Sequence, residues 1–402
     1  MYYWQSSSVG TINAASFTYT VPTYSETLTA YYQSAQNIPI VVTETPTGSG
    51  TLTVDGTQIS APQTFYWVAG STHTLSAQNG NGQFVSWTSP SIGTVNANTI
   101  TYLVPSSGET VQAYYMPPVS TTFSFAFGSY GSGYGQFKNP HFIAVDSSGN
   151  VYVTDSNNTR VEKFDRYGNY VTQWGSFGSG NGQFSEPTGI AVDSSGNVYV
   201  VDSGNYRVEE FTSSGIYLNQ FGSFGSGNGQ FQNPTAIAVD SLGNVYVTDN
   251  STNRVQEFTS SGTYLSQFGS PGSGNGQFDG ASGIAIDPSS GNIYVVDYGH
   301  NRVEEFTKSG TYLTQWGSVG SGNGQFTYPY GIAVDSSGHI YVTDLGNDRV
   351  EVFTTSGTYL TQFGLQGSGN GQFINPTGVA IDSAGNVYVA DNANNRVEVF
   401  HP

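Results

Sequence analysis

The sequence contains no cysteine, few charged residues and no long apolar run. The absence of cysteine excludes disulfide bonds, thiolate metal sites and cysteine nucleophiles. No stretch approaches the roughly 20 consecutive apolar residues that a membrane-spanning helix needs. The opening segment MYYWQSSS lacks the basic start and the apolar middle of a signal peptide. Apolar residues nowhere follow helical spacing, so the sequence predicts an all-β protein.

Positive charge is scarce and confined to one part of the chain. Only 9% of the 402 residues are charged, and the formal net charge is −18. All ten lysines and arginines follow residue 120, and six of them are one repeated arginine. The others are Lys138, Lys163, Arg166 and Lys308. Nucleic-acid binding needs a basic stripe that neutralises phosphates, so we expect no nucleic-acid partner.

A unit of 47 residues, once of 48, recurs six times between residue 121 and the C-terminus. The second copy reads GQFSEPTGIAVDSSGNVYVVDSGNYRVEEFTSSGIYLNQFGS over residues 182–223. Short stretches of Val, Ile, Tyr and Phe between Gly, Ser and Asn clusters predict four strands in each unit. A supersecondary unit repeated at this period indicates a propeller or a solenoid.

The last unit is one strand short, which bears on how the repeats close. Residues 377–400 supply only three strands, whereas TFSFAFGS at 122–129 matches the fourth-strand position of the other units. We expect this early strand to complete the last blade and to close the ring, because closure removes exposed sheet edges. The sequence thus predicts a six-bladed β-propeller with four-stranded antiparallel blades.

The repeated pattern G-x-G-x-GQF-x-x-P-x-G-I-A-V-D-x-x-G-N-V-Y-V-x-D-x-x-N-x-R-V-x-x-F resembles the NHL repeat, a family of six-bladed propellers. The resemblance covers residues 121–402. It implies a rigid scaffold that binds proteins, RNA or small ligands on one face, with enzymes a minority. A fold alone does not assign a function.

The N-terminal region contains a repeat of its own. Residues 1–32 and 84–115 match at one constant offset, so the chain opens in the second half of a module. A half module cannot bury its own apolar face. We therefore expect this sequence to be a fragment, with a signal peptide and further copies upstream.

The complete copy of this module spans about residues 34–116 and also reads as β structure. IPIVVTET (38–45) and GTLTVDG (50–56) predict a hairpin, followed by strands in TFYWVAG, THTLSAQ, QFVSWTS and TVQAYY. The copy resembles the small β repeats strung as stalks along prokaryotic surface proteins. We expect β-sandwich-like repeats before the propeller, with boundaries at 1–33 (partial repeat), 34–116 (complete repeat), 117–120 (linker) and 121–402 (propeller).

Every propeller unit carries an Asp followed five residues later by an Arg. The six pairs are Asp155 and Arg160, Asp202 and Arg207, Asp249 and Arg254, Asp297 and Arg302, Asp344 and Arg349, and Asp391 and Arg396. A ring of charges around a channel is one interpretation. We favour a structural one, in which Asp caps a turn and Arg braces that turn or the next blade, because buried charges are normally paired. Each DSSGN turn offers about one carboxylate, too few for calcium.

We expect function where the copies differ, on the face shared by the fourth-to-first and second-to-third loops. The predicted ligand-binding residues are His141, Thr188, Tyr206, Thr235, Ser282, Tyr298, His300, Tyr328, Tyr330 and Thr377. A second variable set runs beside them and consists of Lys138 and Asn139, Ser185 and Glu186, Gln232 and Asn233, Asp279 and Gly280, Thr327 and Tyr328, and Ile374 and Asn375. Tyrosines with amides and hydroxyls suit a glycan or a peptide, because Tyr offers a ring and a hydroxyl at low ordering cost. The alternative is that these tyrosines merely cover a β surface.

An enzymatic alternative rests on one histidine. Some NHL-like propellers are amidating lyases that hold zinc with histidines from several blades, one of them in a Pro-His-x-x-Ala strand start. Pro140-His141-Phe142-Ile143-Ala144 matches that start, but the equivalents of His141 in the other blades are Thr, Thr, Ser, Tyr and Thr. They cannot complete a three-histidine site. No Ser-His-Asp grouping has a recognisable context, and the GSGNG loops precede no helix that could bind phosphate.

We therefore expect no catalytic residue, no metal and no cofactor, and a non-enzymatic cell-surface or secreted protein. Its propeller would bind a protein, a peptide or a glycan, without inserting into a membrane. The alternatives are a metal-dependent lyase of the amidating type and a structural subunit of a surface assembly. If the protein is secreted, the sequons at Asn157 and Asn250 are possible glycosylation sites.

Overall fold

The computed structural model describes residues 2–6, 10–12, 29–32, 37–45, 50–79, 83–116, 119 and 121–401. The chain divides into two compact units, residues 1–118 and 119–402. The described elements are β-strands except for three short 3-10 turns. In these ranges, no helix is long and apolar enough to span a membrane. Residues 117, 118 and 120 of the expected linker lie outside the described residues.

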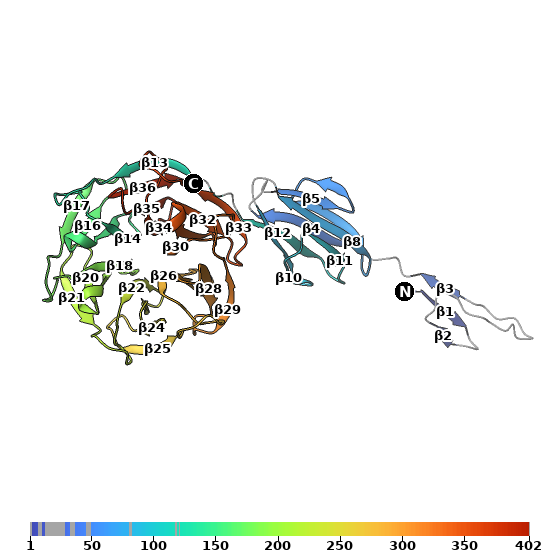
Figure 1. Cartoon of the computed structure of the whole chain (residues 1–402). Helices are drawn as coiled ribbons and strands as arrows, with labels where there is room; N and C mark the ends of the chain where they lie inside the picture. Colours follow the sequence, from blue (N-terminus) through green and yellow to red (C-terminus); the bar gives the residue numbers. More distant parts are fainter. Residues whose placement is uncertain are drawn as a thin grey trace, which may run out of the picture. The chain divides into compact units, whose positions relative to one another are not determined.

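The second unit contains six four-stranded antiparallel sheets, which we number as blades 1 to 6 (Figure 1). Blade 1 has β14 (Pro140–Val145), β15 (Val151–Asp155), β16 (Arg160–Phe164) and β17 (Tyr170–Trp174). Blade 2 has β18 (Pro187–Val192), β19 (Val198–Asp202), β20 (Arg207–Phe211) and β21 (Tyr217–Phe221). Blade 3 has β22 (Pro234–Val239), β23 (Val245–Asp249), β24 (Arg254–Phe258) and β25 (Tyr264–Phe268).

The remaining blades follow the same strand order. Blade 4 has β26 (Ala281–Ile286), β27 (Ile293–Asp297), β28 (Arg302–Phe306) and β29 (Tyr312–Trp316). Blade 5 has β30 (Pro329–Val334), β31 (Ile340–Asp344), β32 (Arg349–Phe353) and β33 (Tyr359–Phe363). Blade 6 has β34 (Pro376–Ile381), β35 (Val387–Asp391), β36 (Arg396–His401) and β13 (Thr122–Phe127). The 3-10 turns are η1 (Ser156–Asn158), η2 (Ser203–Asn205) and η3 (Leu345–Asn347).

The early strand closes the ring, as the sequence predicts. β13 pairs antiparallel with β36, so that Phe123 lies opposite Phe400 and Phe127 opposite Val397. The first strand of each blade contacts the first strands of its two neighbours, including β14 against β34 (Figure 1). The all-β fold and the six-bladed propeller are therefore confirmed.

The core lies between the blades, and the sequence pattern shows why. The second strand of each blade, such as β19, is buried along its whole length because it is covered by blades on both sides. The Phe of each GQF motif packs between two sheets: Phe184 is fully buried, with its ring centroid 5.6 Å from that of Phe211. A glycine lies beneath it, since a Cβ on Gly175 would stand 2.6 Å from the Phe184 ring.

The first unit contains nine strands in two sheets and a separate sheet of three strands. One sheet has the order β10 (Gly93–Val95), β9 (Gln83–Ser89), β12 (Glu109–Met116), β4 (Asn37–Thr45) and β7 (Gln63–Val68). The other has the order β11 (Thr99–Leu103), β8 (Thr72–Asn79), β5 (Gly50–Val54) and β6 (Thr57–Ile59). Apolar residues of both sheets share one core around Trp87, which gives the sandwich-like packing.

The hairpin predicted from residues 38–45 and 50–56 is wrong. β4 pairs with β7 and β12, whereas β5 pairs with β6 and β8, so the two segments belong to different sheets. Ile40 on β4 and Leu52 on β5 are both buried in the shared core. The alternation of apolar and polar residues therefore identified the buried face of each strand. Two strands of a hairpin and two strands in facing sheets show the same alternation, so the pattern cannot distinguish them.

The internal repeat of the first unit is visible as identical strand pairing. In the three-stranded sheet, β1 (Tyr2–Ser6) lies between β2 (Gly10–Ile12) and β3 (Thr29–Tyr32). Trp4 on β1 lies opposite Ile12 and Ala30. In the complete copy, Trp87 on β9 lies opposite Val95 and Ala113, and each of the three positions is displaced by the same number of residues.

Candidate functional site

Side-chain hydroxyls tie neighbouring blades together where the first strands begin. In blades 1, 3 and 5 the hydroxyl comes from the second strand. Thr154 Oγ1 donates to the carbonyl oxygen of Thr188 at 2.6 Å, and Thr248 and Thr343 make the same bond to Ser282 and Thr377 at 2.7 Å. Each bond reaches the second residue of the next blade's first strand. This position therefore lies at an inter-blade contact.

Blades 4 and 6 make this inter-blade bond from the other strand, whereas blade 2 does not make it within the described contacts. The second strands of these three blades carry Val201, Val296 and Ala390, which have no hydroxyl. The first strand supplies it instead: Ser282 Oγ donates to the Tyr330 carbonyl oxygen at 3.1 Å, and Thr377 Oγ1 to that of His141 at 2.7 Å. Thr188 occupies the same position in blade 2, but its Oγ1 is buried without a hydrogen-bond partner.

This alternation explains which predicted site residues are available for other contacts. In blades 1, 3 and 5 the second-strand threonine makes the inter-blade bond, so His141, Thr235 and Tyr330 are released from it. Ser282 and Thr377 are almost fully buried and use their hydroxyls between blades. The structure thus separates the predicted ring into residues that hold blades together and residues that are free to differ.

A cavity of about 220 Å³ opens among these positions. We call it the mouth pocket, and its lining residues are His141, Glu186, Thr188, Ser203, Asn233, Thr235, Asn250, Tyr298 and Tyr330. They come from blades 1 to 5, from the starts of first strands and from second-to-third loops. No lysine or arginine lines the pocket. A small polar hollow of this kind is a typical site for a small ligand or for one group of a larger one.

Aromatic rings form one wall of the mouth pocket and continue beyond it. Tyr298 and Tyr330 stand perpendicular, with ring centroids 6.1 Å apart. Tyr328, which is 50% exposed, stacks on Tyr298 at 5.1 Å. Tyr330 also contacts the rings of His141 and Phe142 at 5.3 and 5.7 Å. The aromatic wall therefore leads from the buried floor of the pocket to the solvent.

His141 and Tyr330 are uncharged at neutral pH. Burial lowers the pKa of His141 to about 4, and burial raises the pKa of Tyr330 above its usual range. The Tyr330 hydroxyl lies 3.4 Å from His141 Nε2, while His141 Nδ1 is buried without a partner. The Glu186 carboxylate and the side-chain amide of Asn250 also lack a hydrogen-bond partner within the described ranges. The pocket thus holds several neutral or acidic groups with unused hydrogen-bonding capacity.

Three of the predicted ligand-binding residues lie outside the mouth pocket, besides Ser282 and Thr377. Tyr206 packs against Phe224, with ring centroids 4.9 Å apart. Tyr328 contacts the pocket only through Tyr298. His300 Nδ1 lies 2.8 Å from Asp297 Oδ2, where four other blades place an asparagine. His300 therefore takes part in the repeated scaffold, and the prediction that it faces a ligand has no geometric support.

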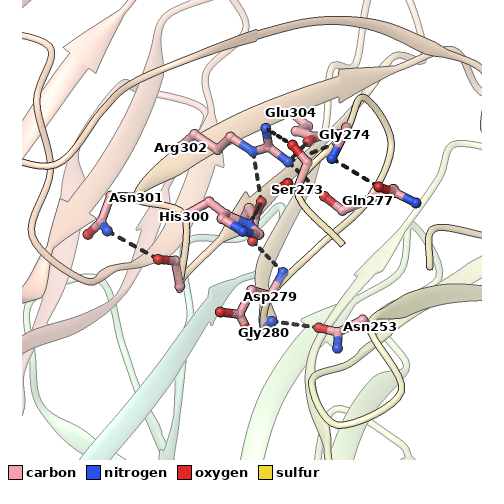
Figure 2. Close-up of polar contacts among 12 residues, drawn as sticks. Asn253, Ser273, Gly274, Gln277, Asp279, Gly280, His300, Asn301, Arg302 and Glu304 are labelled. Atoms are coloured by element: carbon pink, nitrogen blue, oxygen red, sulfur yellow. Dashed lines mark hydrogen bonds and ion pairs between the residues drawn. The ribbon is translucent and has the colours of Figure 1, made fainter. Parts of the chain in front are cut away.

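The repeated Arg and Asp form a buried ion-pair network, shown for blade 4 in Figure 2. Arg302 Nε lies 2.7 Å from Asp297 Oδ2, and its Nη2 lies 2.6 Å from Glu304 Oε1. The same guanidinium donates to the carbonyl oxygens of Ser273, Gly274 and Gln277. These carbonyls belong to the loop that carries the GQF motif of the same blade. The arginine therefore braces that loop rather than the next blade, which refines the predicted role.

Blade 3 departs from this network. Asp249 accepts hydrogen bonds from the main-chain amides of Gln232 and Asn233, and Arg254 Nε is buried without a partner. Gln256 stands where the other blades carry a glutamate, and it accepts from the amide of Gly229 at 2.8 Å. Blade 3 therefore has no Asp–Arg ion pair among the described contacts, but Arg254 still braces the loop of the GQF motif through the carbonyl oxygens of Ser226, Gly227 and Gln230.

No metal site is present among the residues that the structure describes, since no three His, Asp or Glu side chains converge. A larger hollow of about 420 Å³ lies around the first-to-second turns of blades 2 to 4, and Asp193, Asp240 and Asp287 line it with Lys308. Each of these aspartates accepts hydrogen bonds from its own turn. These three aspartates are thus explained by their role in forming the turns, as the sequence indicates.

A Ser-His-Asp grouping does occur in the first unit, contrary to the expectation from sequence. Ser71 Oγ lies 3.1 Å from His73 Nε2, and His73 Nδ1 lies 2.7 Å from Asp55 Oδ2. The main-chain amides of Gly70 and Ser71 already donate to carbonyl oxygens of Val104 and Val68. Neither amide can then bind an oxyanion, which serine catalysis requires. The grouping therefore holds strands β5 and β8 together.

The two sequons differ in environment. Asn157 is exposed on η1, whereas Asn250 is partly buried and lines the mouth pocket. A glycan on Asn250 would fill the pocket. Ser203 and Asn250 were not predicted as ligand contacts, because their loops gain significance only when neighbouring blades meet. Phe142 gave a signal that sequence reasoning overlooked, since Gly or Ala occupies its position in the other five blades.

Comparison with known families identifies both units. The NHL repeat matches residues 137–164, 184–211, 231–258, 278–306, 326–353 and 373–400. This is an NHL-repeat protein. Its first unit matches the divergent InlB B-repeat domain over residues 40–117. No curated protein matches the sequence.

Solved structures similar to this NHL-repeat protein include both uncharacterised proteins and enzymes. A structural genomics protein of unknown function from Bacteroides thetaiotaomicron is 18% identical, with a TM-score of 0.56 over 89% of this chain and 99% of that one. A gluconolactonase from Xanthomonas campestris is 15% identical, with a TM-score of 0.52 over 71% and 99%. Virginiamycin B lyase from Staphylococcus aureus reaches a TM-score of 0.47 at 14% identity, over 90% and 99%. At these identities the likeness shows the fold alone.

Proposed function

We propose that this chain is a non-enzymatic binding protein of a cell surface or of the extracellular space, and that its mouth pocket binds one sugar residue of a glycan. The B-repeat unit acts as part of a stalk that presents the propeller. This location rests on the match of residues 40–117 to a domain type of the surface-protein kind. The ligand class rests on the chemistry of the pocket.

One observation carries the ligand class: unused hydrogen-bonding groups converge on a pocket that also has an aromatic wall. The Asn250 side-chain amide and the Glu186 carboxylate belong to residues that line the pocket, and neither group has a hydrogen-bond partner within the described ranges. A polyhydroxylated ligand can satisfy several such groups at once. The Tyr298 ring offers the apolar surface on which a sugar ring stacks. No lysine or arginine lines the pocket, which disfavours phosphate or other strongly anionic ligands.

A glycan array probed with the full chain tests this function. We expect binding to a restricted set of glycans. Tyr298→Ala and Asn250→Ala should each weaken binding about fivefold, because each removes one contact worth roughly 1 kcal/mol. Tyr206→Ala is the matched control, since Tyr206 packs against Phe224 outside the pocket. The proposal fails if no glycan binds, or if Tyr206→Ala weakens binding as much as Tyr298→Ala does.

A further inference from the structure

A second set of inter-blade hydrogen bonds surrounds the mouth pocket, and it is incomplete. Each second-to-third loop ends in a left-handed residue, and in four blades this residue caps a main-chain amide of the next blade. Asn253 Oδ1 accepts from Gly280 at 2.6 Å (Figure 2), and Asn301 Oδ1 accepts from Tyr328 at 2.8 Å. Asp348 caps Asn375 at 2.8 Å, and Asn395 caps Asn139 at 3.1 Å. We call this contact the inter-blade cap.

Blades 1 and 2 lack the cap. Thr159 and Tyr206 occupy the capping position with φ of 52° and 59°, a region that costs more for a β-branched or bulky residue than for Asn. The Thr159 hydroxyl donates to the carbonyl of Asn158 instead. The amide that Tyr206 would cap, on Asn233, is bonded to Asp249. The amide that Thr159 would cap, on Glu186, has no partner in the described part of the chain.

Glu186 is therefore exceptional among the six equivalent positions. Asn139, Tyr328 and Asn375 share its left-handed backbone. Among the six equivalent amides in the described part of the chain, that of Glu186 alone has no hydrogen-bond partner, and the residue lines the mouth pocket. Glu186 is exposed, so a ligand in the pocket can reach a main-chain donor that the protein itself leaves unpaired. At the equivalent amides of three other blades, the acceptor is the side-chain carboxamide oxygen of an asparagine. The Glu186 amide lacks an acceptor of this kind.

We propose that the ligand supplies the missing acceptor, and that this acceptor is the carbonyl oxygen of an acetamido group on the bound sugar. An acetamido carbonyl has the same chemistry as the asparagine carboxamide that caps the equivalent amides. The Glu186 carboxylate, free in the described structure, is the acceptor for the acetamido N–H. This inference rests on the proposed function and narrows it to N-acetylated sugars, with Glu186 as the specificity-determining residue.

The test compares N-acetyl-D-glucosamine with D-glucose, which lacks the acetamido group, by calorimetric or NMR titration of the full chain. We expect N-acetyl-D-glucosamine to bind about thirtyfold more tightly, because the acetamido group adds two hydrogen bonds that are each worth about fivefold in affinity. Bound sugar should also slow hydrogen exchange at the Glu186 amide. Equal affinities, or no binding of N-acetyl-D-glucosamine, would overturn the inference. Glycan-array binding that depends on Tyr298 would then still leave the broader function standing.

A variant that installs the cap gives an independent test. Thr159→Asn should place a carboxamide oxygen on the Glu186 amide, as Asn301 does for Tyr328. We expect slower exchange of that amide in the free protein, a higher Tm, and loss of the preference for the N-acetylated sugar. Asn395→Thr is the matched control: it removes the cap of Asn139, outside the pocket, and should lower Tm without changing the preference. A Thr159→Asn protein with a protected Glu186 amide and an unchanged preference would contradict the inference.

Discussion

At the scale of single residues, equivalent positions in different blades serve as internal controls for one another. Thr188 and Thr377 occupy the same place in blades 2 and 6, and both are more than nine-tenths buried. The Thr377 hydroxyl donates to the His141 carbonyl oxygen, whereas the Thr188 hydroxyl has no partner. The two threonines are therefore buried to a similar extent and differ in whether the hydroxyl makes a hydrogen bond.

Their valine variants should therefore differ in stability. Thr377→Val should lower the free energy of unfolding by about 1 kcal/mol, because it leaves a buried carbonyl without its donor. Thr188→Val should leave stability unchanged or raise it slightly, because it removes an unsatisfied buried hydroxyl. Chemical denaturation of the two variants would measure the difference. Equal destabilisation would show that the Thr188 hydroxyl is bonded in solution.

The buried glutamates of the ion-pair network predict a dependence of stability on pH. Burial raises the pKa of Glu209 to about 7 against an ordinary value of 4.5, and the glutamates of four other blades behave likewise. Between these values the folded state binds more protons than the unfolded state, so stability falls as the pH rises from about 4.5 to 7. When Glu209 is protonated, Arg207 and Asp202 form an ion pair with no net charge. The buried site therefore favours the protonated form of Glu209.

Glu209→Gln tests this dependence, with Gln256 in blade 3 as the natural precedent. We expect the variant to fold, to match or exceed the wild type in Tm at pH 8, and to lose less stability between pH 5 and pH 8. Thermal unfolding at the two pH values measures the effect. His141 contributes with the opposite sign, because its lowered pKa makes stability fall as the pH drops from 6.5 to about 4. A Tm that rises from pH 5 to pH 8 in the wild type would contradict the role of the glutamates.

At the scale of elements, β13 decides whether blade 6 has an exposed edge. It pairs with the outer edge of β36, whose main-chain groups on that side would otherwise be unpaired; the other edge of β36 pairs with β35. A free edge of this kind is a template for pairing with another chain. The strand therefore completes a sheet and also protects the last blade against self-association.

Two shortened chains test the contribution of β13. A chain of residues 119–402, which retains β13 and forms one compact unit, should unfold cooperatively as a monomer. A chain of residues 131–402, which lacks β13, should lose at least several degrees in Tm and should associate through β36. Size-exclusion chromatography and thermal unfolding measure both effects. A monomeric, equally stable shorter chain would mean that β13 contributes little to closure.

At the scale of the whole molecule, the sequence predicts those features of the fold that follow from the repeat, namely the number of blades and the closure of the ring. Period, strand count and the displaced early strand were sufficient to predict the closed ring, because each observation concerns one unit or its copy number. The assignment of β4 and β5 to different sheets could not be predicted, because the alternation of apolar and polar residues shows which face of a strand is buried without showing which strand lies alongside.

The candidate site was accessible from the sequence only in part. Variability among copies identified His141, Thr188, Thr235, Tyr298 and Tyr330, which the structure places around one pocket. It could not show that hydroxyls at Ser282 and Thr377 are used between blades, or that the Glu186 amide is uncapped. Such properties depend on contacts between units, and the sequence of a unit does not encode the distance to its neighbour.

The pairing of β13 with β36 also has a mechanical consequence. Thr122 at the start of β13 lies opposite His401 at the end of β36. Tension applied between these two residues would break the hydrogen bonds between β13 and β36 one after another. The ring would therefore open at low force. Tension between Thr122 and a ligand held at the mouth pocket would instead be shared among the blades. A propeller pulled through a bound ligand would therefore withstand more force than one pulled between Thr122 and His401.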